Sequence, residues 1–205
     1  EDFKVTSFCA PPTVYRYFIK KDMKKFDLSH LEHITTAGEA LNPEVFEQVH
    51  KQTGLQIMEG FGQTESVLML GNLVGSTAKI GSLGKPTPLY NIMIADNEGK
   101  RLSANEVGEI VVIPSENQHG IFMGYCGNED LYANVWKYGI YHTGDTAYMD
   151  DDGYYWYVGR IDDLIKTRGY RVGPFEIENV LMEHPAVMEC AVTGIPDKAR
   201  GQAIK

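Results

Sequence analysis

Apolar and polar residues in the first third of the chain alternate between the spacing of strands and that of helices. Three short β-rich runs occupy residues 3–9, 31–35 and 55–58. Between them, two stretches with helical spacing open at the Pro11-Pro12 pair and at Pro43, and proline suits the first position of a helix. Strands that alternate with helices predict the end of a parallel α/β layer, which binds ligands at the carboxyl ends of its strands.

The second of these helices carries signals at both ends. Asn42 can cap it, because the side-chain oxygen can accept a hydrogen bond from a free N–H of the first turn. Residues 45, 46 and 49 form its apolar stripe, and Gly54 lies just past its end. The sequence therefore predicts a helix that begins at Pro43 and stops before Gly54.

The middle of the chain has a different pattern. Glycines and prolines between residues 71 and 88 interrupt any long element, and turn signals follow at residues 96–99 and 151–153. This spacing suits a small antiparallel β-barrel or a distorted sheet. The expected strands are residues 91–95, 107–113 and 154–158. The aromatic run in the last strand is expected to pack in the core and along the edge, since a strand sends alternate rings to opposite faces.

The last part of the chain predicts the start of a small α+β domain. Pro174 can begin a helix with an apolar face at residues 177, 180 and 181, and residues 187–192 suit a strand. The chain is thus expected to contain the end of an α/β layer, a β-barrel lobe, and a hinge with the start of a mobile C-terminal domain. The expected limits are residues 1–75, 76–159 and 160–205.

Composition narrows the classes of function. The 205 residues carry a formal net charge of -9. This argues against binding to nucleic acid or an anionic membrane, because both need clustered lysine and arginine. No apolar run could span a bilayer and no signal peptide precedes Glu1, so a cytoplasmic protein is expected. The three cysteines lack the spacing of a zinc site and are expected as buried, reduced thiols.

Charged residues and glycines concentrate between residues 141 and 178. Asp145 follows Gly144 and an expected glycine turn, where its carboxylate could accept two hydrogen bonds from a vicinal diol such as a ribose. Four cations follow that suit phosphate or carboxylate oxygens. They are Arg160, Lys166, Arg168 and Arg171. One acid with several bases indicates a nucleotide site, and the alternative is a surface hairpin followed by a salt-bridged loop.

Two glycine-containing loops are expected where the predicted parallel strands end, at residues 36–40 and 59–66. In the second loop, Gly60 and Gly62 would let the backbone approach a flat ring. The loop also offers an aromatic face, a hydroxyl for a phosphate and an oxygen for a hard cation. These belong to Phe61, Thr64 and Glu65. Taken alone, each loop is better explained as an ordinary turn.

Four motifs resemble those of the adenylate-forming superfamily, which comprises acyl-CoA synthetases, luciferases and the adenylation domains of peptide synthetases. They are YHTGD, GRIDDLIKTRGYRVGPFEIE, AGEAL and FGQTE. The resemblance covers the whole chain, and the residues of the motifs favour AMP-forming acyl-CoA synthetases of the acetyl and medium-chain type. It implies two α/β layers with a β-barrel beside them and a mobile small domain.

The resemblance also implies a role for each motif residue. The implied contacts to ATP or AMP are Gly38, Glu39, Ala40, Glu59, Gly60, Phe61, Gly62, Gln63, Thr64, Asp145, Arg160 and Arg171. The implied contacts to coenzyme A are Arg168, Gly169 and Tyr170. Thr64 and Glu65 are implied in adenylation, with Glu65 on Mg²⁺, and Asp162 is implied as the hinge.

The implied reaction has two steps. A carboxylate and ATP give an acyl-adenylate and pyrophosphate, and the thiol of coenzyme A then displaces AMP. The implied cofactors are ATP, Mg²⁺ and coenzyme A, and the substrate is a short-chain, medium-chain or aromatic carboxylic acid. Acetate-specific relatives carry a bulky aromatic residue at the position of Gly62, which closes the acyl pocket. The glycine therefore implies an acid longer than acetate.

Two other functions stay open at this point. The chain could belong to an adenylation domain that loads a carrier protein, or to a non-catalytic module that senses AMP. The phosphate loop and the catalytic lysine of the superfamily are expected before Glu1 and beyond Lys205. The isolated chain is therefore expected to be inactive.

Overall fold

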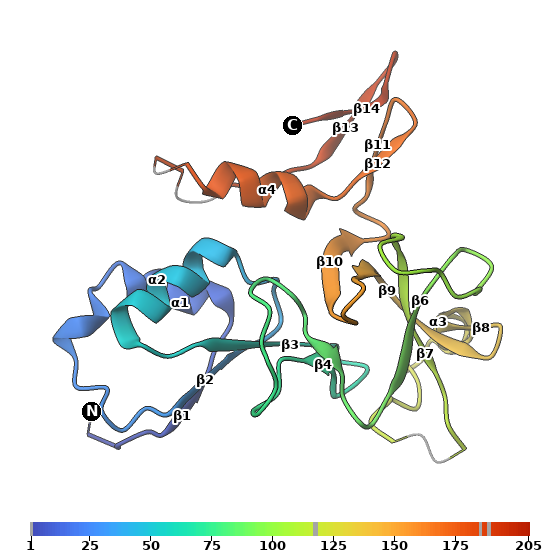
Figure 1. Ribbon diagram of the computed structural model, residues 1–205. Helices are drawn as coiled ribbons and strands as arrows, with labels where there is room; N and C mark the ends of the chain where they lie inside the picture. Colours follow the sequence, from blue (N-terminus) through green and yellow to red (C-terminus); the bar gives the residue numbers. More distant parts are fainter. Residues whose placement is uncertain (1, 117–118, 185, 188–189) are drawn as a thin grey trace. The chain divides into compact units, whose positions relative to one another are not determined.

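The structure is a computed structural model that describes residues 2–116, 119–184, 186–187 and 190–205. The chain forms two compact units (Figure 1). Unit 1 contains Glu1–Leu89 and His119–Phe122, and unit 2 contains Tyr90–Gln118 and Met123–Lys205. The three-part division at residues 75 and 159 stays a prediction. Within the described residues, no helix is both long and apolar enough to cross a membrane.

Unit 1 is built on a five-stranded sheet in the order β1-β2-β3-β4-β5. The first three strands are parallel and the last two pairings are antiparallel. The strands are β1 (Ser7–Cys9), β2 (His33–Thr36), β3 (Ile57–Gly62), β4 (Leu68–Gly71) and β5 (Lys85–Pro86). The parallel part confirms the α/β layer that the alternating pattern predicted.

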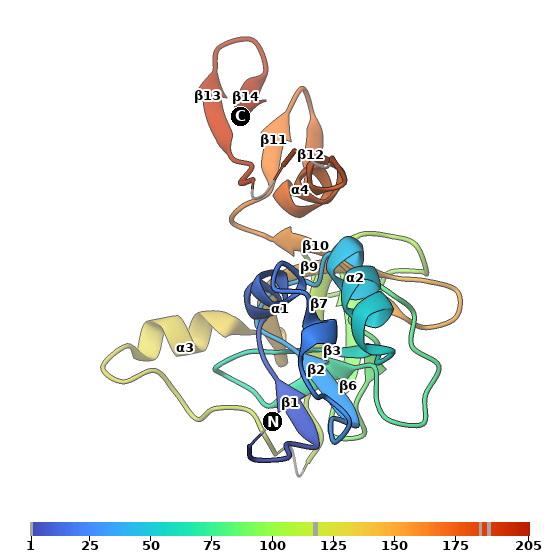
Figure 2. The ribbon, with the colours of Figure 1, turned by 90° about the vertical axis from the view of Figure 1, so that its left-hand side faces the viewer.

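Two helices connect the parallel strands, α1 (Pro12–Ile19) and α2 (Pro43–Thr53), with a 3₁₀ turn η1 (Met23–Lys25) between them. Both helices lie on one face of the sheet (Figures 1 and 2), because right-handed crossovers between neighbouring strands place them there. The predicted end signals of α2 are confirmed. Asn42 accepts a hydrogen bond from the N–H of Glu44 at 2.9 Å, and Gly54 ends the helix with φ 76°.

The core of unit 1 lies between these helices and the sheet. It includes Tyr15 of α1, Ile34 of β2 and Val49 of α2, each no more than 1% exposed. A cavity of about 470 Å³ extends from this core toward the strand β1 and the segment after α1. Its lining contains apolar side chains such as Phe8, Phe18 and Leu31 and none of the predicted nucleotide contacts. The cavity is therefore separate from the predicted nucleotide loops.

Unit 2 contains a four-stranded antiparallel sheet in the order β10-β9-β7-β6. Its strands are β6 (Asn91–Ala95), β7 (Gly108–Ile113), β9 (Ile140–Met149) and β10 (Tyr155–Arg160), and a short strand β8 (Trp136–Lys137) pairs with β9. The described strands form an open sheet, so a closed β-barrel is not observed. The alternative that the sequence allowed, a distorted sheet, is the one present.

One helix and several aromatic side chains complete this part of unit 2. Helix α3 (Glu129–Val135) has no buried residue and stands away from the strands in Figure 2. Of the aromatic run, Tyr155 is 2% exposed in the core. Trp156 stacks on Tyr148 of β9 with ring centroids 6.2 Å apart. The expected core and edge packing is confirmed for these two side chains.

A second sheet of unit 2 has the order β12-β11-β14-β13 and is antiparallel throughout. Its strands are β11 (Ile165–Thr167), β12 (Tyr170–Val172), β13 (Gly194–Asp197) and β14 (Gly201–Ile204). Helix α4 (Pro174–Met182) begins at the predicted proline. The strand expected over residues 187–192 includes residues 188–189, which lie outside the described residues.

The cysteines differ from the expectation of buried thiols. Cys9 and Cys126 are exposed and Cys190 is half-buried, all three without a disulfide. Cys9 is the last residue of the edge strand β1, and Cys126 lies in the segment before α3. A small apolar side chain at an edge or in a connecting segment has no layer above it to bury it.

Candidate functional site

The loop after β2 is tied to helix α1 through Glu39. The Glu39 carboxylate accepts a hydrogen bond from the Thr13 hydroxyl at 2.8 Å and lies 3.3 Å from Nη2 of Arg16. Gly38 has φ 92°, a value that favours glycine. These contacts fix the shape of the AGEAL loop from within unit 1. Nucleotide contacts by residues 38–40 stay a prediction.

Glu59 is a buried residue of strand β3 that is hydrogen-bonded to this loop. Its side chain is 4% exposed, and Oε1 accepts a hydrogen bond from the N–H of Leu41 at 3.0 Å. Neither Oε2 of Glu59 nor Oγ1 of Thr36, its partner residue on β2, pairs with any group among the described residues. Burial raises the pKa of the Glu59 carboxyl to about 8, against a smaller opposing effect of the Leu41 hydrogen bond. The carboxyl is therefore mainly neutral at pH 7.

The FGQTE motif begins in a strand and not in a loop as expected. Residues 59–62 belong to β3, where Gly60 and Phe61 pair with Gly71 and Leu70 of β4. The strand continues here because β4 returns antiparallel beside it and supplies backbone partners. The loop is reduced to residues 63–66.

The glycine at position 62 has a structural reason that differs from the predicted one. A Cβ added there would lie 2.7 Å from the carbonyl oxygen of Val67, at a register shift between β3 and β4. The side-chain direction at Gly62 thus points at the chain's own backbone and not into an empty acyl volume. The predicted link between this glycine and the length of the acid is therefore not supported by the structure.

Replacing Gly62 with alanine is expected to destabilise unit 1 by about 1–3 kcal/mol, because Val67 must move. The matched control is Gly71→Ala, whose Cβ would meet side-chain carbons of Leu68 and Leu73 at 3.3 Å, atoms that can shift. Thermal unfolding of both variants at one pH checks this. Equal losses in the two variants would contradict the backbone clash.

Thr64 and Glu65 occupy the two central positions of a turn. The N–H of Ser66 donates to the carbonyl of Gln63, and the N–H of Gln63 donates to the Ser66 hydroxyl, both at 3.1 Å. Thr64 is exposed and Glu65 is half-buried. No cluster of three or more metal-binding side chains exists among the described residues. A single carboxylate such as Glu65 suits Mg²⁺ that is also held by substrate phosphates.

The YHTGD motif lies inside strand β9, and not at a turn as expected. His142 pairs with Val111 of β7 and Thr146 pairs with Glu109, so residues 143–145 of β9 face Ile110 alone. Two residues of β9 are therefore extra, which makes a β-bulge, and Gly144 adopts φ 74° within it. The bulge bends the strand and presents Asp145. The sequence predicted a turn in this role.

Asp145 is a buried carboxylate with partners on the neighbouring strand β10. It is 5% exposed, and its Oδ1 accepts a hydrogen bond from the Tyr157 hydroxyl at 3.2 Å. Its Oδ2 lies 3.4 Å from Nη1 of Arg160, which also donates to the carbonyl of Thr143 at 3.1 Å. Burial, followed by the nearby charge of Asp145, raises the pKa of Tyr157 and keeps the hydroxyl protonated. The structure thus brings Asp145 and Arg160 together.

Tyr157 is a site residue that the sequence did not reveal. It was assigned to packing with the other aromatic residues at 154–156. Its hydrogen bond to Asp145 depends on the register between β9 and β10. The spacing within the motif alone carries no signal of that register.

The remaining predicted residues lie after β10. Asp162 is in a turn, with its side chain 84% exposed and its Oδ2 4.0 Å from Nη2 of Arg160. Arg168 and Gly169 form the tight turn between β11 and β12, with φ 50° and 86°. Arg171 is in β12, in the second sheet of unit 2. A hinge at Asp162 and coenzyme A contacts by residues 168–170 stay predictions.

Comparison with known proteins gives a consistent result. Residues 1–126 match the family described as AMP-binding enzyme, and residues 176–205 match the AMP-binding enzyme C-terminal domain. The mitochondrial acyl-coenzyme A synthetase ACSM3 of Mus musculus is 46% identical over 99% of this chain and 35% of its own length. The 4-hydroxybutyrate–CoA ligase 1 of Metallosphaera sedula is 48% identical over 100% of this chain and 36% of its own.

A solved structure agrees with these sequence relatives. The anthranilate CoA ligase AuaEII, in complex with anthranoyl-AMP, superposes with a TM-score of 0.90 at 37% identity, over 99% of this chain and 39% of that one. The chain therefore spans slightly more than a third of the length of the relatives it matches. The AGEAL and FGQTE motifs lie within residues 1–126, which the first family model matches. The YHTGD motif lies between the two matched ranges and is covered by the sequence relatives. The chain belongs to the AMP-binding enzyme family, the adenylate-forming enzymes that include acyl-CoA synthetases.

Proposed function

We propose that the full-length protein is an ATP-dependent acid–CoA ligase that forms an acyl-adenylate and then an acyl-CoA. The main observation behind this proposal is the position of Asp145 in the β9 bulge. Its buried carboxylate lies beside the half-exposed guanidinium of Arg160 on β10. A carboxylate at this place accepts hydrogen bonds from two neighbouring hydroxyl groups of a ribose. The adjacent guanidinium binds phosphate oxygens with paired donors.

In unit 1, considered by itself, Glu59 offers a point of recognition for an adenine ring. Its unpaired Oε2 is buried next to the AGEAL loop. A buried oxygen without a partner is costly, so a ligand that satisfies it gains affinity. The exocyclic amine of adenine can donate to the ionised carboxylate, and a ring nitrogen can accept from the neutral acid. Either pairing supports a purine nucleotide as the ligand of unit 1.

The chemistry proposed for the ligase depends on placement and charge. In unit 2, Arg160 would orient phosphate groups. In unit 1, Thr64 offers a hydroxyl and Glu65 a carboxylate on a short turn. Mg²⁺ bound by Glu65 and the phosphates would neutralise the charge that develops on the phosphate oxygens. Coenzyme A, for which we propose contacts by residues 168–170, supplies the thiol that accepts the acyl group. No covalent intermediate with a side chain is required.

The acid is proposed to be short-chain, medium-chain or aromatic. The relatives support this range by name, since one acts on 4-hydroxybutyrate and another on anthranilate. The test is ATP–pyrophosphate exchange by the full-length protein with acetate, butyrate, hexanoate and benzoate. We expect a higher kcat/KM for one of the longer or aromatic acids than for acetate. Absence of exchange with every acid, in protein that is folded and binds AMP, would favour the AMP-sensing alternative.

The acceptor and the location need separate tests. Incubation of the adenylating protein with coenzyme A or with a carrier protein is expected to give product with coenzyme A. Product formed with the carrier protein but not with coenzyme A would contradict the ligase proposal and support the carrier-loading alternative. We propose the cytoplasm as the location, and cell fractionation tests it against the mitochondrion, where ACSM3 resides by name.

A further inference from the structure

We propose that Glu109 is a positioning residue that holds Asp145 in the geometry needed for the ribose of ATP. The inference rests on the proposed function, because it assigns a support to the residue that would bind the nucleotide. Glu109 lies on β7, opposite Thr146 of β9, and its side chain is 13% exposed. Asp145 itself lies on β9, so the proposed action passes from one strand to the next.

The two carboxylate oxygens of Glu109 bind β9 at two places. Oε1 accepts a hydrogen bond from the N–H of Gly144 at 2.9 Å. Oε2 lies 2.7 Å from Nδ1 of His142, whose side chain is 12% exposed. The carboxylate therefore spans the bulge from the residue before Thr143 to the residue after it. A hydrogen bond to an ionised group is stronger than one between neutral groups.

Three other polar groups of the bulge are paired with groups other than Glu109, which defines what Glu109 contributes. The carbonyl of Gly144 accepts from the N–H of Ile161 at 2.9 Å, and the carbonyl of Thr143 accepts from Arg160 at 3.1 Å. The N–H of Asp145 donates to the Thr143 hydroxyl at 3.1 Å. Glu109 supplies the acceptor for the Gly144 N–H. Without that acceptor the bulge loses the bond that holds its glycine against β7.

A loosened bulge would change the direction of the Asp145 carboxylate. Gly144 has φ 74°, and a Cβ there would lie 2.9 Å from Nη2 of Arg160, so the backbone packs directly against the guanidinium. A shift of Gly144 therefore changes both Asp145 and its partner Arg160. A displacement of about 1 Å at a reacting group can lower a rate by about 100-fold. The change should therefore weaken the binding of the ribose hydroxyl groups of ATP.

The test is Glu109→Ala in the full-length protein, with kcat/KM measured for ATP and for 2′-deoxy-ATP in pyrophosphate exchange. We expect the wild type to prefer ATP, and the variant to lose about tenfold in kcat/KM for ATP through a higher KM, as for one lost bond to a charged group. The ATP to 2′-deoxy-ATP ratio should fall as well. Glu109→Gln, which keeps an acceptor for the Gly144 N–H, should retain most of the ratio.

Four further variants separate positioning from loss of folding. Glu98→Ala removes an exposed glutamate from the turn after β6 and should leave both values unchanged. His142→Asn keeps a donor toward Glu109, whereas His142→Leu removes it, so the ratio should be higher in the first. If Glu109→Ala does not fold, this His142 pair carries the test. In a protein that already carries Asp145→Asn, adding Glu109→Ala should lower the ATP to 2′-deoxy-ATP ratio no further.

The outcomes distinguish this inference from the proposed function. A wild-type protein without exchange activity for any acid overturns the proposed function and this inference with it. A fully active wild type, with Glu109→Ala and His142→Leu variants that keep the wild-type ATP to 2′-deoxy-ATP ratio, overturns this inference alone. A lower ratio with normal thermal unfolding supports it, since a merely structural role would reduce activity toward both nucleotides equally.

Discussion

Asp145→Asn in the full-length protein should lower kcat/KM for ATP in pyrophosphate exchange by about 100-fold or more. Each hydrogen bond to a charged acceptor is worth about 1.5–3 kcal/mol, and the proposed ribose contact contains two. The substitution preserves the shape of the side chain but removes its charge and one acceptor. It also removes the charge that Arg160 meets at 3.4 Å, so the guanidinium loses an orienting partner.

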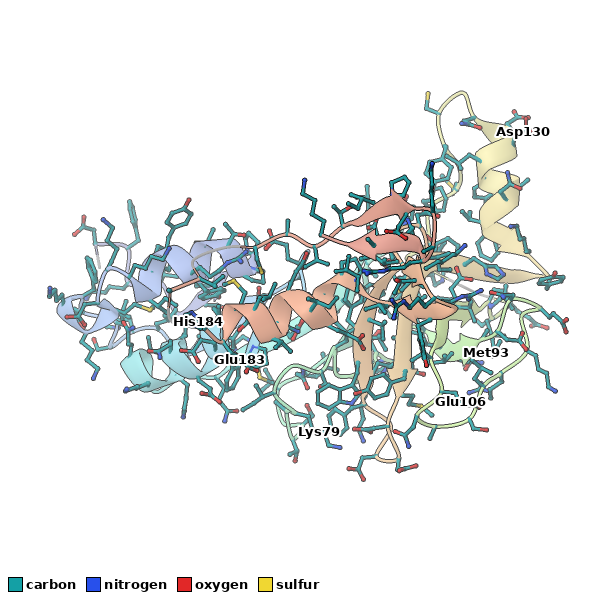
Figure 3. All side chains as sticks on the ribbon, turned by 90° about the horizontal axis from the view of Figure 1, so that it is seen from above. Lys79, Met93, Glu106, Asp130, Glu183 and His184 are labelled. Carbon is teal, nitrogen blue, oxygen red and sulfur yellow. The ribbon has the colours of Figure 1, made fainter. Side chains whose placement is uncertain are left out.

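The matched control for this prediction is Asp130→Asn. Asp130 is an exposed carboxylate of the same unit, on α3, and Figure 3 shows it at the end of that helix far from the β9–β10 pair. This variant should keep the wild-type rate. A near-normal kcat/KM for ATP in Asp145→Asn, measured over the same range of ATP concentrations as for the wild type, would remove the basis of the nucleotide site.

The second large effect concerns stability and involves Glu59. The folded state raises its pKa from 4.5 to about 8, mainly by burial. A carboxyl group whose pKa is raised in the folded state makes its full contribution to the free energy of unfolding below pH 4.5. This contribution is lost as the pH rises to about 8. One pKa unit corresponds to about 1.4 kcal/mol, so the free energy of unfolding should fall by several kcal/mol across this range.

Glu59→Gln is expected to abolish this pH dependence. Glutamine keeps an acceptor for the Leu41 N–H and a donor on the second atom, but it has no charge to desolvate. The variant should therefore melt about 5 °C or more above the wild type at pH 8.5 and close to it at pH 5. Thermal unfolding between pH 5 and 9, without nucleotide, measures this.

An exposed glutamate of the same unit serves as the control. Glu47 lies on the solvent side of α2, and Glu47→Gln should change the melting temperature little at either pH. If wild type and Glu59→Gln show parallel pH profiles, the buried carboxyl does not titrate in the predicted range. Its proposed contact with adenine would then need a carboxylate that is ionised at neutral pH.

Local signals in the sequence were sufficient for the elements that such signals specify. Pro43, Asn42 and Gly54 set the limits of α2, because capping bonds and proline geometry act within one helical turn. Residues 91–95 form β6 with the predicted limits. The ordered motifs indicated the adenylate-forming family, which the matches over residues 1–126 and 176–205 confirm.

Predictions were wrong where a neighbouring strand decides the conformation. Residues 59–62 were expected in a loop and lie in β3, because β4 pairs with them. Residues 143–145 were expected at a turn and form a bulge, because β7 is two residues shorter at this point. Gly62 was assigned to an acyl pocket, while the structure places the Val67 carbonyl beside it.

The sequence by itself determined the alternation of strands and helices, the helix ends, and which residue types are available for a nucleotide. Those features depend on contacts within a few residues. The tertiary structure alone decided which side chains support them: Leu41 on Glu59, Tyr157 on Asp145 and Glu109 on Gly144. Leu41 lies in the loop after β2 and meets Glu59, 18 residues away, only in the folded chain. Tyr157 and Asp145 are 12 residues apart and Glu109 and Gly144 are 35 apart, and only the register of neighbouring strands brings these pairs within hydrogen-bonding distance.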